Sequence, residues 1–165
     1  MSDLDAVAAA IRPATAADAP GIRAIRDSLA IWTSREQTEA EALAWLTPQI
    51  TRGTALVAKR VDGEILGFAV ASAWQAYEGY ARTVEDSIYL SPAARGCGLG
   101  GRLLATLVEA AQRAGDRTMV AQIEASTTTS VRFHERAGFV VVGTIEAAGE
   151  KHGRVLDLVL MSRRL

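Results

Sequence analysis

Apolar residues recur at the spacing of an amphipathic helix in four stretches of the chain. The first stretch begins at Thr15–Asp18 and Pro20, since a capping residue followed by a first-turn proline is typical of a helix N-terminus. Ile22, Ile25 and Leu29 then repeat every three or four residues. This pattern predicts a first helix with one buried face.

Three further helices follow from the same spacing. Leu43, Leu46 and Ile50 fall on one face of a helix over Thr38–Ile50. A leucine-rich stripe predicts a helix over Leu99–Ala111, which Gly115 ends, because glycine commonly follows a helix C-terminus. The last predicted helix is Thr128–Ala137, closed by Gly138.

Short apolar runs between the helices predict strands. Thr54–Val61 and Glu64–Ala73 flank Asp62-Gly63, and an Asp-Gly pair between two apolar runs is a strong hairpin signal. The segment Trp74–Arg82 is predicted to be an irregular aromatic loop. The other predicted strands are Thr83–Ser91, stopped by Pro92, Thr118–Ile123, Val140–Ile145, Val155–Met161 and a first strand fed by Ala6–Ile11.

The element order is therefore β-α-α-β-β-β-α-β-α-β-β. The early strands meet as hairpins, and the strand-helix-strand unit from Thr83 to Ile123 is expected to be a parallel right-handed crossover. This order predicts a single α/β domain over residues 1–165, with a mixed sheet and helices on its faces.

Composition excludes several classes of protein. Hydrophobic residues make up 49% and charged residues 22%, an ordinary globular mix that excludes disorder, collagen-like structure and coiled coil. A net charge of −1 provides no bulk field for nucleic acid or an anionic membrane. The acidic start Met1–Asp5 does not suit a signal peptide, and no apolar run reaches the ~20 residues of a spanning helix. A soluble cytoplasmic protein is expected, with no nucleic-acid or membrane partner.

Cysteine and histidine are too few for a disulfide framework or a zinc site. Cys97 is the single cysteine, and His134 and His152 are the only histidines. We therefore expect no metal centre.

The segment Pro92–Gly101 is rich in glycine and lies between a predicted strand and a predicted helix. Its glycines let backbone N–H groups turn toward a ligand without a Cβ in the way. The helix N-terminus adds about half a positive charge. Together with Arg95, these features predict a site for a phosphate or pyrophosphate.

The same segment formally matches a dinucleotide fingerprint, Gly96-x-Gly98-x-x-Gly101, with Glu124 as the acid that would bind a ribose. Three features disfavour that interpretation. Glu124 lies further along the chain than the expected ~20 residues. The glycines do not follow their strand directly, and the fingerprint sits late in a short chain, behind a hairpin. A P-loop would also need a lysine that this segment lacks.

The ordered motifs resemble a known family. Arg95-x-x-Gly98-x-Gly100 resembles the (Gln/Arg)-x-x-Gly-x-(Gly/Ala) signature of the GNAT family of N-acetyltransferases. The segments Thr83–Pro92, Phe133–Phe139 and Gly149–Met161 resemble its phosphinothricin / methionine-sulfoximine acetyltransferase branch. The similarity runs from about Ile11 to Met161.

This resemblance implies a mostly antiparallel sheet whose central parallel strands splay to admit CoA. Backbone groups of Ile88 and Leu90 would bind the pantetheine arm like an extra strand, and the loop amides would hold the pyrophosphate. Thr127 stands where the branch usually has an asparagine that contacts pantetheine. The cofactor residues expected on this basis are Ile88, Tyr89, Leu90, Arg95, Gly96, Cys97, Gly98, Leu99, Gly100, Thr127 and Ser130.

Amide formation from a thioester requires a neutral amine, so a general base or a water relay helps at pH 7. Glu85 is the best candidate for the base, and the branch has glutamate there. Asp86 points to the opposite face of the strand. His134 stands where many family members have a tyrosine acid, and it could protonate the departing thiolate or serve only in packing. Direct transfer needs no acyl-enzyme, which disfavours a Cys97–His134 nucleophilic pair.

The acceptor site is expected at Trp74, Tyr77 and Tyr80, with Glu85 at its floor. These aromatics supply apolar walls with polar tips, which suits a small amphipathic substrate. Relatives tend to carry a basic residue where Gln75 and Tyr77 stand, so we expect weak use of doubly anionic acceptors. The connection between the first two helices can also border this site.

These features predict an acetyl-CoA-dependent N-acetyltransferase that acts directly, in a ternary complex, on the primary amine of an amino acid or an analogue. The alternatives are an enzyme acting on peptide or protein amines, a non-catalytic acyl-CoA-binding module, and last the dinucleotide-binding protein. The resemblance suggests a homodimer.

Overall fold

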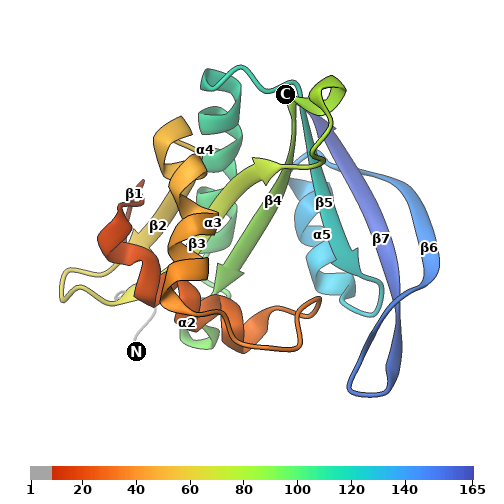
Figure 1. Cartoon of the computed structure of the whole chain (residues 1–165), viewed down its shortest axis with the longest axis horizontal. Helices are drawn as coiled ribbons and strands as arrows, with labels where there is room; N and C mark the ends of the chain where they lie inside the picture. Colours follow the sequence, from red (N-terminus) through yellow and green to blue (C-terminus); the bar gives the residue numbers. More distant parts are fainter. Residues whose placement is uncertain (1–8) are drawn as a thin grey trace.

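A seven-stranded sheet in the order β1-β2-β3-β4-β5-β7-β6 organises the computed structural model, which describes residues 9–165 (Figure 1). Every neighbouring pair is antiparallel except β4 and β5, so the predicted mixed, mostly antiparallel sheet is confirmed. Residues Ala6–Ala8 of the predicted first strand lie outside the described residues. The strands are β1 Ala10–Pro13, β2 Ala55–Lys59, β3 Ile65–Ala73, β4 Thr83–Leu90, β5 Thr118–Glu124, β6 Val140–Lys151 and β7 Arg154–Arg164.

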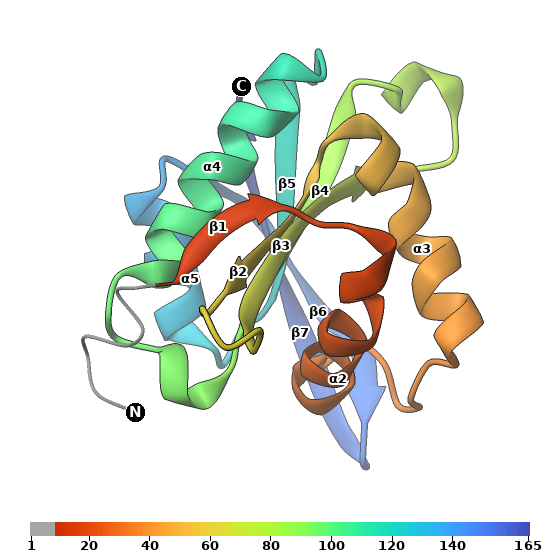
Figure 2. The ribbon, with the colours of Figure 1, turned by 90° about the vertical axis from the view of Figure 1, so that its left-hand side faces the viewer.

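The four predicted helices form, and they cover both faces of the sheet (Figure 2). Thr38 caps α3 with a capping box, and Gly53 ends that helix in the left-handed region. None of the helices within residues 9–165 is long and apolar enough to cross a bilayer. The helices are α2 Ala19–Leu29, α3 Glu39–Arg52, α4 Leu99–Arg113 and α5 Thr128–Arg136.

Two cores lie on opposite faces of the sheet. One buries the leucine stripe of α4 against alternate residues of the central strands, such as Ala69 and Val84. The other buries Ile22 of α2 and Leu46 of α3 against Phe68 and Val70 of β3. Successive strand residues point to opposite faces of the sheet. The residues before and after Val84 on β4 therefore face the side of the sheet covered by α2 and α3.

The parallel pair β4–β5 is short. It joins only Thr83–Glu85 to Thr118–Val120. Beyond that point the two strands separate, although β4 stays paired with β3 as far as Leu90 and β5 with β7 as far as Glu124. The facing backbone groups of both strands therefore lose their sheet partners. The splay implied by the family resemblance is present.

The β6–β7 hairpin is longer than the sequence pattern predicts. Register shifts interrupt β6 between Ile145 and Gly149, and this irregular stretch resembles a loop in the sequence. Pairing resumes beyond it and continues to Lys151. His152 and Gly153, with φ of 51° and 73°, make the two-residue turn, as a hairpin of this type requires.

The two leucines expected on one face of α3 differ in burial. Leu46 is fully buried, whereas Leu43 is 39% exposed. We predict that Leu46→Ala lowers the free energy of unfolding by about 2–5 kcal/mol, the usual cost of a cavity in a core. Leu43→Ala in the same helix should cost well under half as much. Urea unfolding of the two variants measures the difference, and equal losses would contradict this account of the core.

Candidate active site

A cavity of about 540 Å³ lies in the opening between β4 and β5. Asp86–Leu90 form one wall and Ala121–Glu124 the other. The glycine-rich loop closes one end, and Ile31 and Trp32 of the α2–α3 connection border it as well. Its walls therefore contain the backbone groups that the splay leaves without sheet partners.

Two glycines shape the loop that ends the cavity. Gly96 and Gly98 have φ of 80° and 79°, a region that residues with a Cβ rarely adopt. Gly98 is the N-cap of α4 and has no side chain to satisfy the first N–H groups of the helix. The helix thus presents free amide donors at its N-terminus, where a phosphate group is stabilised.

Close packing brings α4 to the cavity. A Cβ on Gly100 would lie 3.1 Å from a methyl of Leu90 and 3.4 Å from the ring of Phe133. Gly100 and Arg95 line the cavity. The Cys97 thiol instead donates to the carbonyl of Ala94 at 3.2 Å, inside the loop.

A turn held by Glu124 positions the start of α5. The Glu124 carboxylate accepts from the backbone N–H of Ser126 at 3.0 Å and from the Thr127 hydroxyl at 3.3 Å. Hydrogen bonds from Ser126 hold the pKa of Glu124 below its ordinary value. Thr127 and Ser130 line the cavity beyond this turn.

Glu85 lies at the last parallel pair, beside the cavity. Its carboxylate accepts from the side-chain amide of Gln122 at 2.7 Å. Burial raises the pKa of Glu85 above the ordinary value, and the nearby charge of Asp86 adds to this, while the Gln122 hydrogen bond opposes it. A carboxylate with a raised pKa and one neutral partner is suited to accept a proton.

Asp86, the next residue, contacts a different partner on the opposite face. Its Oδ2 lies 2.9 Å from Nε2 of His134, and both side chains are buried. The other ring nitrogen, Nδ1, lies 2.8 Å from the carbonyl oxygen of Ser130. Burial opposes protonation of His134, but the hydrogen bond and charge of Asp86 outweigh it and raise the pKa of the imidazole.

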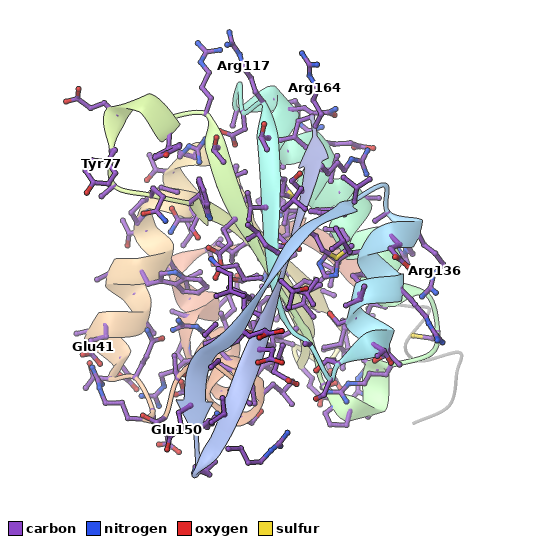
Figure 3. The ribbon with its side chains drawn as sticks, turned by 90° about the vertical axis from the view of Figure 1, so that its right-hand side faces the viewer. Glu41, Tyr77, Arg117, Arg136, Glu150 and Arg164 are labelled. Atoms are coloured by element: carbon purple, nitrogen blue, oxygen red, sulfur yellow. The ribbon has the colours of Figure 1, made fainter. Side chains whose placement is uncertain are left out.

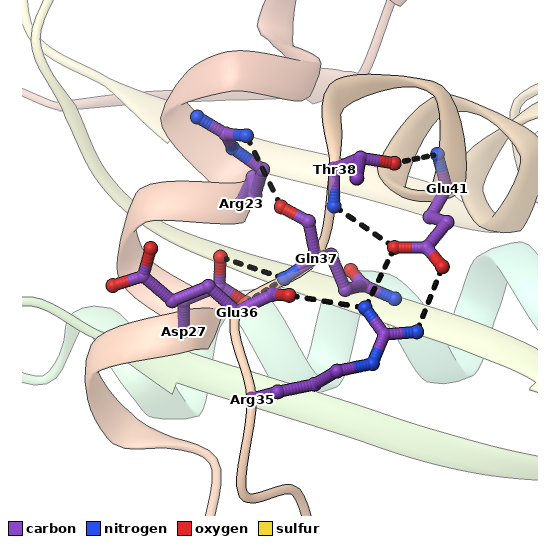
Figure 4. A network of polar contacts seen from close by, with 7 residues as sticks. All are labelled: Arg23, Asp27, Arg35, Glu36, Gln37, Thr38 and Glu41. Atoms are coloured by element: carbon purple, nitrogen blue, oxygen red, sulfur yellow. Dashed lines mark hydrogen bonds and ion pairs between the residues drawn. The ribbon is translucent and has the colours of Figure 1, made fainter.

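A polar network fixes the α2–α3 connection (Figure 4). Arg23 on α2 donates to the carbonyl of Gln37 at 3.1 Å. Asp27 accepts from the Gln37 N–H at 3.3 Å. Arg35 makes two hydrogen bonds, of 2.7 and 2.9 Å, to Glu41 in the first turn of α3. The connection that carries Trp32 is thereby tied to both helices.

The β6–β7 hairpin touches the same connection. Lys151 donates to the carbonyl of Ala30 at 2.6 Å, and a Cβ on Gly149 would lie 3.0 Å from the indole of Trp32. The hairpin tip and the α2–α3 connection thus meet beside the cavity.

The predicted acceptor aromatics lie on a different loop. Trp74 and Tyr80 pack edge to face with ring centroids 5.1 Å apart, whereas Tyr77 is 74% exposed. Tyr77 lies toward the opposite end of the molecule from Glu150 at the hairpin tip (Figure 3). None of the three lines the large cavity. A smaller hollow of about 390 Å³ lies beside them, lined by Glu78, Arg82 and Arg117 among others.

The structure thus places the sequence-predicted residues in three groups. Lining the cavity are Ile88, Tyr89, Leu90, Arg95, Gly96, Gly100, Thr127, Ser130 and His134. Beside it lie Glu85 and three loop residues, Cys97, Gly98 and Leu99. Apart from it lie Trp74, Tyr77 and Tyr80.

Sequence reasoning missed Gln122 and Phe133 as site residues. A lone polar residue within the apolar strand Thr118–Ile123 was the available signal for Gln122. Within residues 9–165, no group of three or more potential metal ligands comes together.

Comparison with known proteins agrees with this geometry. Residues 22–139 match the acetyltransferase (GNAT) family. An L-methionine sulfoximine/L-methionine sulfone acetyltransferase of Pseudomonas aeruginosa is 39% identical over 96% of each chain. A phosphinothricin acetyltransferase of Sinorhizobium meliloti, solved in complex with AcCoA, is 37% identical, with 96% of this chain and 89% of that one covered and a TM-score of 0.89.

Another similar structure is named for a protein acceptor rather than a small molecule. The ribosomal-protein-alanine N-acetyltransferase of Brucella melitensis is 36% identical, with coverage of 94% of this chain and 99% of that one and a TM-score of 0.87. The glycine-rich loop, the separated strands and these similarities lead to one conclusion: the chain belongs to the GNAT family of acetyltransferases.

Proposed function

We propose that this protein is an acetyl-CoA-dependent N-acetyltransferase acting on the primary amine of an amino acid or an analogue, as a single domain over residues 1–165. The observation that carries the proposal is the cavity. It connects the loop of free amide donors with the opening between β4 and β5, and Glu85 lies where these two strands begin to separate. The resemblance to the methionine sulfoximine and phosphinothricin acetyltransferases supports the substrate class.

The separated strands suit an extended cofactor. The pyrophosphate would lie on the amides around Gly98 and Gly100, and the pantetheine arm would take up the backbone groups of Ile88 and Leu90. Thr127, whose hydroxyl reaches Glu124, and Ser130 would face the arm from α5. A bound acetyl-CoA supplies the activated acyl group, and the protein supplies its position.

Glu85 takes a proton from the acceptor ammonium or its relay water, and the resulting amine attacks the thioester carbonyl directly. The C–N bond forms as the C–S bond breaks, the electron pair leaves with the CoA sulfur, and the nitrogen releases its remaining extra proton to water. His134 lines the cavity and is proposed as the donor that protonates this thiolate. A thiolate is also a tolerable leaving group near neutral pH.

The acceptor is proposed to enter on the face of the sheet that carries Glu85. Ser72 of β3 pairs with Glu85, and Trp74 directly follows β3, with its N–H donating to the carbonyl of Thr83 at 3.2 Å. We propose that Trp74, Tyr77 and Tyr80 wall the acceptor site at one end. The Brucella similarity makes a protein N-terminus the second candidate acceptor.

A cytoplasmic homodimer is the proposed form of the enzyme. Edge strand β6 carries exposed Val140, Val141, Val142 and Ile145, each at least 49% exposed. An edge strand with such a surface is prone to pair with another chain.

Acetyl-CoA should raise the melting temperature, because a ligand at 100 times its Kd stabilises the native state by about 2.7 kcal/mol. Gly98→Val should remove most of this shift. Gly53→Val is the matched control, since Gly53 has a similar φ of 74° and equally open surroundings but ends α3. A full shift in folded Gly98→Val would refute the assignment of the loop.

Glu85→Gln should lower kcat by roughly 10²–10⁴-fold, the contribution of a positioned general base, while the Kd for acetyl-CoA stays unchanged. Because the pKa of Glu85 is raised, wild-type activity should fall with decreasing pH earlier than an ordinary carboxylate would allow. The variant should lack this acidic limb. Steady-state rates between pH 5 and 9 test both points, and wild-type turnover in Glu85→Gln would end its catalytic role.

Variants of two tryptophans, Trp74 and Trp32, test where the acceptor binds. If the aromatic loop forms the acceptor site, Trp74→Ala raises the acceptor KM, and Tyr77→Arg improves use of phosphinothricin relative to a neutral amine. Trp32→Ala, in the α2–α3 connection, is the comparison variant. A change in acceptor KM with Trp32→Ala alone would move the site to that connection. Thiol release over a panel of amino acids, methionine sulfoximine, phosphinothricin and an alanine-initiated peptide gives these constants and identifies the acceptor class.

A further inference from the structure

The Asp86–His134 pair joins β4 to α5, and both residues line the cavity. Asp86 is the first residue of β4 beyond the parallel pairing with β5. His134 is the only buried residue of α5, which is otherwise half-buried or exposed. Val131 and Phe133 of α5 pack against the core beside α4, and the buried contact that joins the helix to β4 is a polar one, at 2.9 Å.

Both nitrogens of the His134 ring are occupied within the protein. The carbonyl of Ser130 can only accept, so Nδ1 carries a proton. When Nε2 also carries a proton, it donates to the Asp86 carboxylate, and the ring is then an imidazolium held between two acceptors. Phe133 and Phe139 pack edge to face against it, each with a centroid separation of 5.1 Å. The ring cannot rotate without losing these four contacts.

A buried ion pair is a poor means of gaining stability. Apolar residues of similar volume often stabilise a protein as well or better, because both charges must leave water. The pair instead provides a defined geometry. Its hydrogen bond fixes the distance and orientation of β4 relative to α5, which have no backbone pairing to each other.

We propose that Asp86 is a positioning residue for acetyl-CoA: with His134 it clamps α5 to β4 and sets the width of the opening that receives the pantetheine arm. The two walls it holds apart carry Ile88–Leu90 on one side and Thr127 and Ser130 on the other. This inference rests on the proposed function for the identity of the ligand. It assigns to His134 a role exercised through Asp86, separate from proton transfer to the thiolate.

The test uses Asp86→Asn, His134→Gln and the double variant in the full chain. In Asp86→Asn, a side-chain amide N–H can still donate to a neutral His134, so the fold should survive while the charge pair is lost. We expect the Kd and KM for acetyl-CoA to rise on the order of tenfold, with the double variant no weaker than either single one, as for coupled residues in contact. The acetyl-CoA Kd is the decisive readout, because a role of His134 confined to proton transfer would leave that Kd unchanged.

Asp116→Asn is the matched control. Asp116 is a buried carboxylate 2.6 Å from the partly exposed Arg52, and neither residue lines the cavity. This variant should lower the melting temperature and leave the acetyl-CoA Kd unchanged.

Calorimetric titration with acetyl-CoA alone separates the possible failures. Wild-type protein that does not bind acetyl-CoA refutes the proposed function itself. Binding that Asp86→Asn leaves intact overturns the clamp, as does an additive double variant. A fall in kcat with unchanged KM in both single variants would also overturn it and would favour His134 as a proton donor. If one single variant fails to fold, the double variant, with two amides in contact, is compared with wild type for the same Kd.

Discussion

The early end of the β4–β5 ladder is the constraint on which the rest of the site depends. Two parallel strands pair for three residues and then separate, yet neither strand is left without support. β4 remains hydrogen-bonded to β3 and β5 to β7, so the sheet can open at its centre without fraying. The unpaired backbone groups along the opening are costly in an apolar interior unless a ligand or water satisfies them. A strand-like ligand arm meets that requirement.

Local pattern predicted the elements well, because most of them are decided by spacing and end signals within a few residues. The helices over Leu99–Arg113 and Thr128–Arg136 appear where the apolar stripe and the following glycines indicated. Long-range contacts were beyond such reasoning. Nothing in the neighbourhood of Asp86 points to His134, which is 48 residues away. The hairpin β6–β7 was underestimated because its bulges break the alternation that identifies a strand.

The residues of the candidate site were predictable to different degrees for the same reason. Gly96 and Gly98 could be identified from the sequence, because a backbone with positive φ favours glycine whatever surrounds it. The position of Trp32 beside the cavity could not be predicted in this way, because it depends on how the β6–β7 hairpin contacts the α2–α3 connection. That approach joins segments more than 100 residues apart, as the Lys151–Ala30 hydrogen bond illustrates. From the sequence, only the family resemblance linked this connection to the proposed acceptor site.

The two adjacent carboxylates of β4 show how one strand can supply two kinds of chemistry. Alternation sends Glu85 to one face, where its hydrogen-bond partner is the neutral amide of Gln122. Burial without a cation keeps its proton affinity high, as a base requires. Asp86 turns to the other face and pairs with His134, whose pKa it raises. A paired carboxylate is a poor base but a good anchor, which agrees with the proposed roles of Asp86 in positioning and Glu85 in proton transfer.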